Sequence, residues 1–166
     1  DFREFCTALL SFLNTDNNGE RIAALDDVYI PSYKLADFTQ DLQVLEETLG
    51  IILPLFGSFA TSNYSVRPVI DYTSLSGRQL LMNFLRQYSR LVVKHGGSLT
   101  GGSPEGRVKL LPGAQPLPEN EQKLYHDIKS TFDPYNILNP GVKLNVDAKM
   151  VLRHLRTTSR PGLITP

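Results

Sequence analysis

Apolar residues recur every three or four positions in two long segments of the chain, and a glycine follows each segment. The two sets are Leu35, Phe38, Leu42, Leu45 and Leu49, and then Leu80, Leu81, Phe84, Leu85, Tyr88, Leu91 and Val92. This spacing brings the apolar side chains to one face of a helix. Gly50 and Gly96 stand where helices commonly end. The pattern therefore predicts two amphipathic helices.

Three further segments have helical character. Asp1–Leu13 carries apolar residues along one side, and Glu119–Phe132 continues until Asp133 and a following proline stop it. Val146–Leu155 is a short amphipathic candidate. Because no methionine precedes Asp1, we expect the chain to begin inside a longer protein.

Runs of residues that favour strands lie between the predicted helices. They are Val28–Ile30, Ile51–Phe56 and Tyr64–Ile70, and the small polar segment Gly57–Asn63 joins the last two. The order strand, helix, strand, strand, helix is that of half a ferredoxin-like split βαβ sandwich, and a further strand near Arg107–Leu111 would complete the sheet. We predict an α+β fold in which helices cover one face of an antiparallel sheet, with a C-terminal helical extension.

The length and composition agree with one domain. A chain of 166 residues with 41% hydrophobic residues can bury a single core. We place the domain at residues 1–143 and a C-terminal tail at residues 144–166.

Charge and cysteine content exclude several function classes. The chain has 17 basic and 17 acidic residues, and this balance disfavours a nucleic acid or an anionic membrane surface as partner. No apolar run approaches the roughly 20 residues of a transmembrane segment. Cys6 is the single cysteine, so the chain cannot form an intrachain disulfide or a thiolate metal cluster. We expect a cytoplasmic protein.

Three segments carry a specific pattern. Ile128–Lys143 reads IKSTFDPYNILNPGVK, Gly96–Lys109 reads GGSLTGGSPEGRVK, and Phe56–Ser65 reads FGSFATSNYS after a D-x-x-x-P element that begins at Asp27. Together they resemble the C-terminal domain of FAD-linked oxidases, a family that includes D-lactate dehydrogenase, D-2-hydroxyglutarate dehydrogenase and the large glycolate oxidase subunit. The first segment is the most specific, because the family reads I-K-x-x-F-D-P-x-x-I-L-N-P-G-K there.

The resemblance also implies a metal site. In the family, two histidines of the strand-turn-strand segment and a glutamate of the glycine-rich loop bind a divalent metal, and a neighbouring histidine acts as base. Those four positions are Ser58, Ser65, Gly102 and Ser103 in this chain. Serine is a poor ligand for zinc-like ions, and glycine has no side-chain ligand at all. We therefore expect no metal in this chain.

A cationic side chain can bind a substrate carboxylate in place of a metal. Arg67 lies two residues after Ser65 and so shares its face of a strand, while Lys109 stands at the family's lysine position. The alternative is that both are ordinary surface charges, and the same alternative holds for Arg107.

The candidate residues fall into two groups, and no catalytic residue is assigned. The substrate-binding candidates are Arg67, Lys109, Asn63 and Ser103, and the cofactor-binding candidates are Asn139, Gly101 and Gly102. Glycines at 101 and 102 would let the backbone approach the flavin or its substrate, although a plain flexible connector is the alternative. The histidines His95, His126 and His154 have no ligand spacing and are interpreted as solvated or capping residues.

The family resemblance implies the substrate-side domain of an FAD-dependent oxidoreductase that oxidises a small 2-hydroxy acid, such as D-lactate or glycolate, or a related alcohol. FAD would be bound mainly by a separate FAD-binding domain of the same protein, so the isolated chain would be inactive. The alternative is a non-catalytic binding or scaffold module derived from this domain. A free-standing ferredoxin-like sensor would explain the sandwich but not the segment 132–143.

Overall fold

A small antiparallel sheet forms the centre of the structure. The computed structural model describes residues 15–16, 19–20, 25–71, 74–102, 106–107, 109 and 118–153. Strand β5 (Asn63–Val66) lies between β3 (Leu25–Tyr29) and β4 (Leu55–Ser58) and pairs antiparallel with both. A separate pair of two-residue strands, β1 (Thr15–Asp16) and β2 (Gly19–Glu20), precedes this sheet. The predicted helix at residues 1–13 lies outside the described residues.

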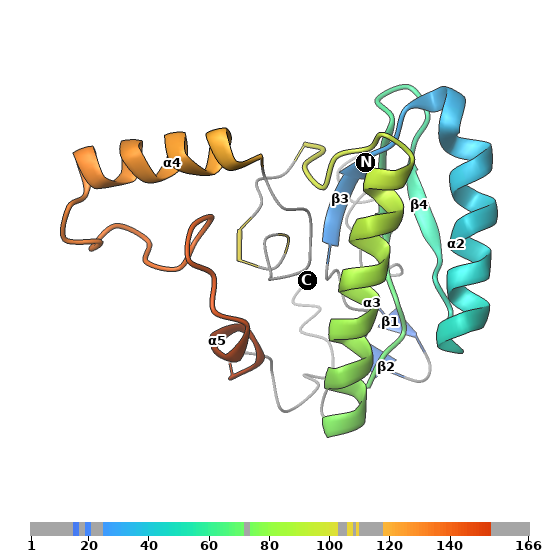
Figure 1. Ribbon diagram of the computed structural model, residues 1–166. Coiled ribbons are helices and arrows are strands. Elements are labelled where there is room, and N and C mark those ends of the chain that lie inside the picture. The colour runs from blue at the N-terminus through green and yellow to red at the C-terminus, as the bar shows by residue number, and fades with distance from the viewer. Residues whose placement is uncertain are drawn as a thin grey trace, which may run out of the picture.

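Two helices cover one face of the sheet. A 3₁₀ turn, η1 (Ser32–Lys34), leads into α2 (Leu35–Leu49), and α3 (Leu75–Lys94) runs beside α2 (Figure 1). The helix α4 (Glu119–Phe132) stands away from this pair. The short helix α5 (Ala148–Arg153) contributes Ala148 and Val151, which pack against the core as partly buried side chains. The predicted α+β sandwich with a C-terminal helical extension is thereby confirmed.

The predicted helix ends are also found. Gly50 closes α2 with φ 64°, and Gly96 follows α3 with φ 69°, both in the left-handed region that glycine adopts without strain. At its other end, α3 is capped by Ser74, whose hydroxyl accepts a hydrogen bond from the Gly77 N–H at 3.1 Å.

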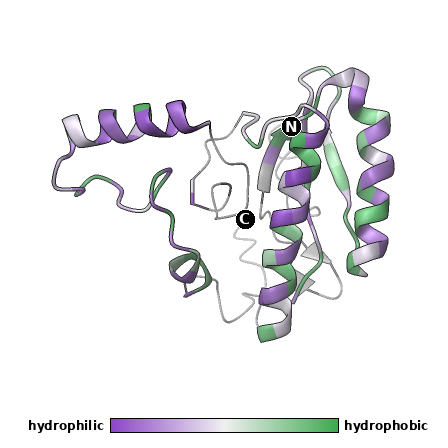
Figure 2. Cartoon of the chain, in the orientation of Figure 1, coloured by the Kyte–Doolittle hydropathy of each residue, from purple (hydrophilic) through white to green (hydrophobic). Residues whose placement is uncertain are grey.

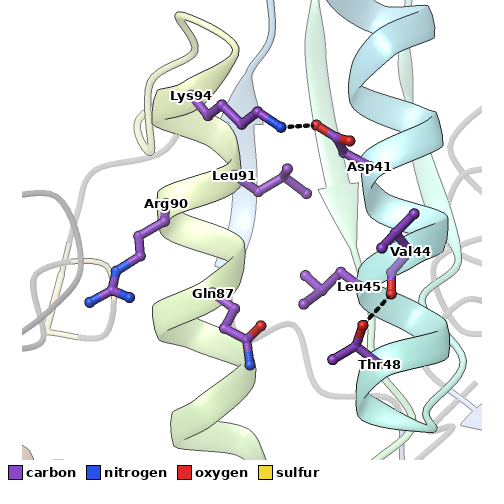
Figure 3. A pocket seen from close by; sticks show the side chains of 8 residues that line it. All are labelled: Asp41, Val44, Leu45, Thr48, Gln87, Arg90, Leu91 and Lys94. Atoms are coloured by element: carbon purple, nitrogen blue, oxygen red, sulfur yellow. Dashed lines mark hydrogen bonds and ion pairs between the residues drawn. The ribbon is translucent and has the colours of Figure 1, made fainter.

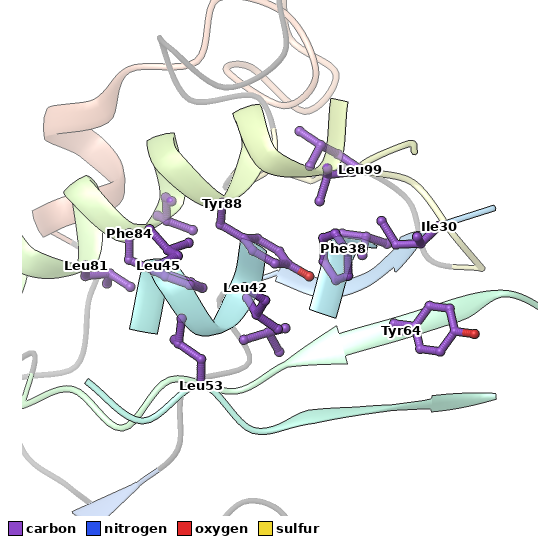
Figure 4. Close-up of a cluster of buried hydrophobic side chains, with 14 of the residues drawn as sticks. Ile30, Phe38, Leu42, Leu45, Leu53, Tyr64, Leu81, Phe84, Tyr88 and Leu99 are labelled. Carbon is purple, nitrogen blue, oxygen red and sulfur yellow. The ribbon is translucent and has the colours of Figure 1, made fainter. Parts of the chain in front are cut away.

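The core lies between this helix pair and the sheet. Its members are buried apolar side chains of β3, β5, α2 and α3 and of the segments next to these elements: Val28, Ile30, Phe38, Leu42, Leu45, Leu53, Tyr64, Val66, Ile70, Leu81, Phe84, Leu85, Tyr88, Val92 and Leu99. The Tyr88 ring of α3 reaches toward Phe38 of α2 (Figure 4), with 6.2 Å between the ring centroids, and stacks on Phe84 at 5.3 Å. Burial raises the pKa of Tyr88 far above its ordinary value of 10.0.

The predicted strand Ile51–Phe56 is shorter than expected. Leu53 is buried, but the strand β4 begins only at Leu55. Pro54 has no N–H to donate to a sheet ladder, which explains the late start. Its carbonyl still accepts from the Arg67 N–H at 3.2 Å.

The further strand that was predicted near Arg107–Leu111 differs in the structure. Within Arg107–Leu111, the described residues Arg107 and Lys109 lie in turns. The outer edge of β3 pairs instead with Ser98, through Tyr29 N–H to Ser98 carbonyl at 2.8 Å and Ser98 N–H to Tyr29 carbonyl at 2.9 Å. Gly97 permits this approach, because a Cβ there would lie 2.5 Å from the Tyr29 carbonyl oxygen.

The surface of α4 differs from that of the helix pair. Its ribbon is mostly hydrophilic with isolated apolar positions (Figure 2), and none of its residues is buried. Within the described part of the chain, no helix has the length and apolar character needed to cross a membrane.

Candidate functional site

The face of the sheet opposite α2 and α3 carries polar side chains. Along β5 and the residues after it, Tyr64 and Val66 are buried in the core, while Asn63, Ser65 and Arg67 are half-buried on the opposite side. This alternation puts Arg67 on the same side as Ser65, as the sequence predicts.

The neighbouring strand adds to this side. Ser58 of β4 is the register partner of Asn63, and Phe56 is the partner of Ser65. Directly opposed residues of an antiparallel pair point to the same side. We call the side that carries Ser58, Asn63, Ser65 and Arg67 the polar face.

A buried ion pair lies beside the polar face. The Lys109 Nζ donates to Asp27 Oδ1 at 2.9 Å and to the Asp27 carbonyl at 3.0 Å. The side chain of Lys109 is only 3% exposed and that of Asp27 is 18% exposed. The structure thus places the predicted lysine against a carboxylate of β3.

The glycine-rich loop lies against the same carboxylate. The Gly102 N–H donates to Asp27 Oδ2, and a Cβ on Gly101 would lie 2.8 Å from both Asp27 Oδ2 and Asn63 Oδ1. A larger residue at position 101 would require the Asp27 or Asn63 side chain to shift, whereas glycine allows the close approach without such a shift. Asn63, Gly101, Gly102 and Lys109, all predicted from the sequence, surround Asp27.

Asp27 itself was not among the predicted site residues. Its signal in the sequence was the D-x-x-x-P element, in which it precedes Pro31 by four positions. Ser103, the remaining loop candidate, lies outside the described residues.

The residues present do not fit a metal site. Ser58 Oγ accepts from the Thr61 N–H at 3.4 Å, and Ser65 Oγ is buried without a hydrogen-bond partner among the described residues. The Asp27 carboxylate already binds Lys109 and Gly102. Across the described segments, no three His, Cys, Asp or Glu side chains gather in a group that could hold a metal ion.

The most specific sequence segment forms a loop held by one carboxylate. Asp133 accepts from the N–H of Ile137 at 2.8 Å and of Leu138 at 2.9 Å. Lys129 donates to Asp133 Oδ2 at 2.5 Å and to the Leu138 carbonyl at 2.5 Å. The lysine, the aspartate and the loop backbone therefore stabilise one another.

This loop contacts the end of the glycine-rich segment. Arg107 Nη2 donates to the Pro140 carbonyl at 3.3 Å, and the Lys143 N–H donates to the Gly106 carbonyl at 3.2 Å. Asn139, the predicted cofactor contact, is exposed and adopts φ 47° beside Pro140. It does not join the residues around Asp27.

The loop is expected to depend on pH. The hydrogen bond from Lys129 holds the pKa of Asp133 below its ordinary value of 3.8, and the N–H groups of Ile137 and Leu138 lower it further. A depressed pKa stabilises the folded loop above the ordinary value, and this contribution is lost as the pH falls through the folded pKa.

Amide hydrogen exchange between about pH 5 and about pH 2 should therefore show Ile137 and Leu138 losing protection below about pH 3.8. Lys129→Met should move that transition to higher pH, because the carboxylate loses its main stabilising partner. Protection that persists unchanged over the whole range would contradict the assignment.

A groove of about 400 Å³ lies between α2 and α3 (Figure 3). At its end Asp41 Oδ2 lies 2.6 Å from Lys94 Nζ and 2.8 Å from His95 Nε2, and the bond from Lys94, followed by that from His95, lowers the pKa of Asp41. His95 is the C-cap residue of α3 and is buried, whereas His126 is exposed and His154 lies outside the described residues. None of the predicted site residues lines this groove.

Comparison with known families gives one match over most of the chain. Residues 7–142 match the family described as "FAD linked oxidases, C-terminal domain". The matched range includes Asp27, Asn63, the glycine-rich loop and Lys109.

Similar curated proteins are hydroxy-acid dehydrogenases by name. A D-2-hydroxyglutarate dehydrogenase from Pantoea ananatis is 25% identical over 149 residues, which cover 89% of this chain and 14% of the relative. A D-2-hydroxyglutarate dehydrogenase from Pseudomonas putida is 28% identical over 70% of this chain and 11% of the relative. A D-lactate dehydrogenase from Archaeoglobus fulgidus is 32% identical over 69% of this chain and 25% of the relative. The chain therefore spans a quarter or less of these proteins.

Proposed function

Because the chain belongs to the family of FAD-linked oxidase C-terminal domains, we propose that it forms the substrate side of a flavoenzyme that oxidises a small 2-hydroxy acid. The observation that carries the proposal is the polar face, where Asn63 and Arg67 share a side with the Asp27–Lys109 pair and the glycine-rich loop. The names of the relatives support D-2-hydroxyglutarate or D-lactate as the class of substrate.

Arg67 is the group that we assign to the substrate carboxylate. A guanidinium binds a carboxylate through two parallel N–H bonds and stays charged at every working pH. Asn63 lies two residues before Ser65 on the same side of β5, and its amide can donate to or accept from the substrate hydroxyl. The direct binding of substrate by Lys109 and Ser103 stays a prediction, and the bonds of Lys109 to Asp27 favour a supporting role for the lysine.

FAD, when bound, would supply the hydride acceptor for the carbon that carries the hydroxyl group, and the hydroxyl proton would pass to water. The proposed contacts of this chain with the cofactor are Gly101 and Gly102, whose backbone can approach a planar ring closely, and Asn139. No step is assigned to a metal, because serine hydroxyls at 58 and 65 are not a suitable ligand set.

The partner that we propose is an FAD-binding domain of the same protein. Exposed apolar side chains lie on α4 and on the loop after it: Leu124, Ile128, Phe132, Tyr135, Ile137 and Leu138. Phe132 and Tyr135 are 80% and 85% exposed, which is unusual for large apolar side chains near each other. Contact with a second domain would cover them.

A non-catalytic binding module derived from this domain is the second candidate. It is favoured by the replacement of all four family metal and base positions with serine or glycine. The two candidates differ in turnover, so an activity measurement separates them.

The test is anaerobic bleaching of the flavin by D-2-hydroxyglutarate, D-lactate and glycolate in the complete flavoprotein that carries this domain. We expect bleaching that a chelator does not abolish. Arg67→Met should lower kcat/KM on the order of 10²–10³-fold, because the carboxylate loses a charged bidentate donor. Arg90→Met, on the exposed surface of α3, should leave kcat/KM within about twofold.

Four results would count against the proposal. Absence of bleaching by all three acids would favour the binding module, chelator-sensitive turnover would exclude the metal-free site, and unchanged kcat/KM in Arg67→Met would remove arginine from the carboxylate. Tight binding of FAD to the isolated chain would contradict a cofactor site located mainly on another domain.

A further inference from the structure

The Asp27 carboxylate has two acceptor oxygens with different donors. Oδ1 accepts from the Lys109 ammonium at 2.9 Å, while Oδ2 accepts from the Gly102 N–H. An ammonium that is 3% exposed needs such a carboxylate, because a buried charge without a partner is strongly disfavoured. The Asp27 carboxylate therefore binds both the Lys109 ammonium and the backbone of the glycine-rich loop.

The loop is also in direct contact with the polar face. A Cβ on Gly102 would lie 3.4 Å from Asp27 Oδ2 and 3.8 Å from Asn63 Nδ2, and the space at Gly101 is tighter still. The hydrogen bond from the Gly102 N–H to Asp27 therefore fixes how closely the loop lies to Asn63. A change in that bond would alter the space above Asn63.

We propose that Asp27 is the positioning residue of the site: its carboxylate, balanced by Lys109, fixes Gly101 and Gly102 against Asn63. This role deepens the proposed function, on which its catalytic consequence rests. Asp27 acts through the loop and need not touch the substrate itself.

Asparagine at position 27 cannot replace the carboxylate. Its side chain has one acceptor oxygen and one donor NH₂ group, whereas Lys109 and Gly102 both donate. One of the two donors would face another donor. Asp27→Asn therefore changes the charge and hydrogen bonding of the site with little change in its shape.

The primary test is amide hydrogen exchange of the 166-residue chain, which needs neither FAD nor substrate. In Asp27→Asn we expect exchange at Gly102 to accelerate on the order of 10- to 100-fold relative to the core amides of Tyr64 and Val66. Asp37→Asn is the matched control, because Asp37 forms an exposed ion pair with Lys34 at 3.2 Å. It should leave Gly102 unchanged.

Two outcomes would overturn the role of Asp27. One is unchanged exchange at Gly102, and the other is equal acceleration at Gly102 and at the core amides, which is the mark of a purely structural residue. If Asp27→Asn does not fold, the double variant Asp27→Ala with Lys109→Met is measured instead, because it removes both charges and the acceptor together. The same expected and contrary results apply to it.

In the complete flavoprotein, Asp27→Asn should lower kcat/KM for the hydroxy acid at least tenfold while the absorbance spectrum of bound FAD stays unchanged. An unchanged kcat/KM would overturn the catalytic consequence. If no hydroxy acid bleaches the flavin, the proposed function fails, yet exchange at Gly102 still decides whether Asp27 positions the loop.

Discussion

Replacing Lys109 with methionine should lower the free energy of unfolding by about 3–5 kcal/mol. The substitution keeps most of the side-chain volume but leaves the Asp27 carboxylate, which is 18% exposed, without the ammonium at 2.9 Å. Single domains are stable by only about 5–15 kcal/mol, so this loss would be a large share of the total. Urea unfolding near neutral pH measures it.

The same substitution at Lys123 provides the control. Lys123 pairs with Asp127 at 2.7 Å, but the two side chains are 78% and 61% exposed. Solvent screens such pairs, and Lys123→Met should change stability by less than about 0.5 kcal/mol. Equal effects at the two lysines would show that burial of the Lys109 pair does not control its energetics.

Replacing Phe38 with alanine should destabilise the chain by about 3–5 kcal/mol. Phe38 is completely buried and contacts rings on two sides, Tyr88 with centroids 6.2 Å apart and His95 at 5.8 Å. Removal of the ring leaves a cavity between α2 and α3 that rigid neighbours cannot fill. Thermal or urea unfolding measures the loss.

Val44→Ala on the same helix is the matched control. Its side chain is 59% exposed at the groove between α2 and α3, so truncation should change stability by less than about 0.5 kcal/mol. A loss below about 1 kcal/mol in Phe38→Ala would mean that the α2–α3 contact contributes little to the core.

The helices were predictable because their signals are local. Apolar spacing and a following glycine located α2 and α3, and Asp133 followed by proline marked the end of α4 at Phe132. The late start of β4 was harder to predict, since an apolar run such as Ile51–Leu53 is compatible with a strand until the missing donor of Pro54 is considered.

The site was only partly predictable for a related reason. Alternation along β5 was enough to place Arg67 on the side of Ser65, and the family resemblance pointed to Lys109. The partner of Lys109 could not be read from periodicity, because Asp27 lies 82 positions earlier in the chain. Likewise, Ser98 pairs with the edge of β3 through backbone N–H and carbonyl groups, and the pattern of side chains along the sequence does not reveal such pairing.

The double role of the Asp27 carboxylate has a consequence for how the chain folds. It binds Gly102 and Lys109, which lie 75 and 82 positions later in the sequence. The elements α2, β4, β5 and α3 all lie between Asp27 and these two residues. Closing contacts over such separations costs chain entropy, which is offset only after the intervening elements have packed. The site is therefore among the last contacts to form, and an incompletely folded copy of the chain presents no arranged site to a substrate.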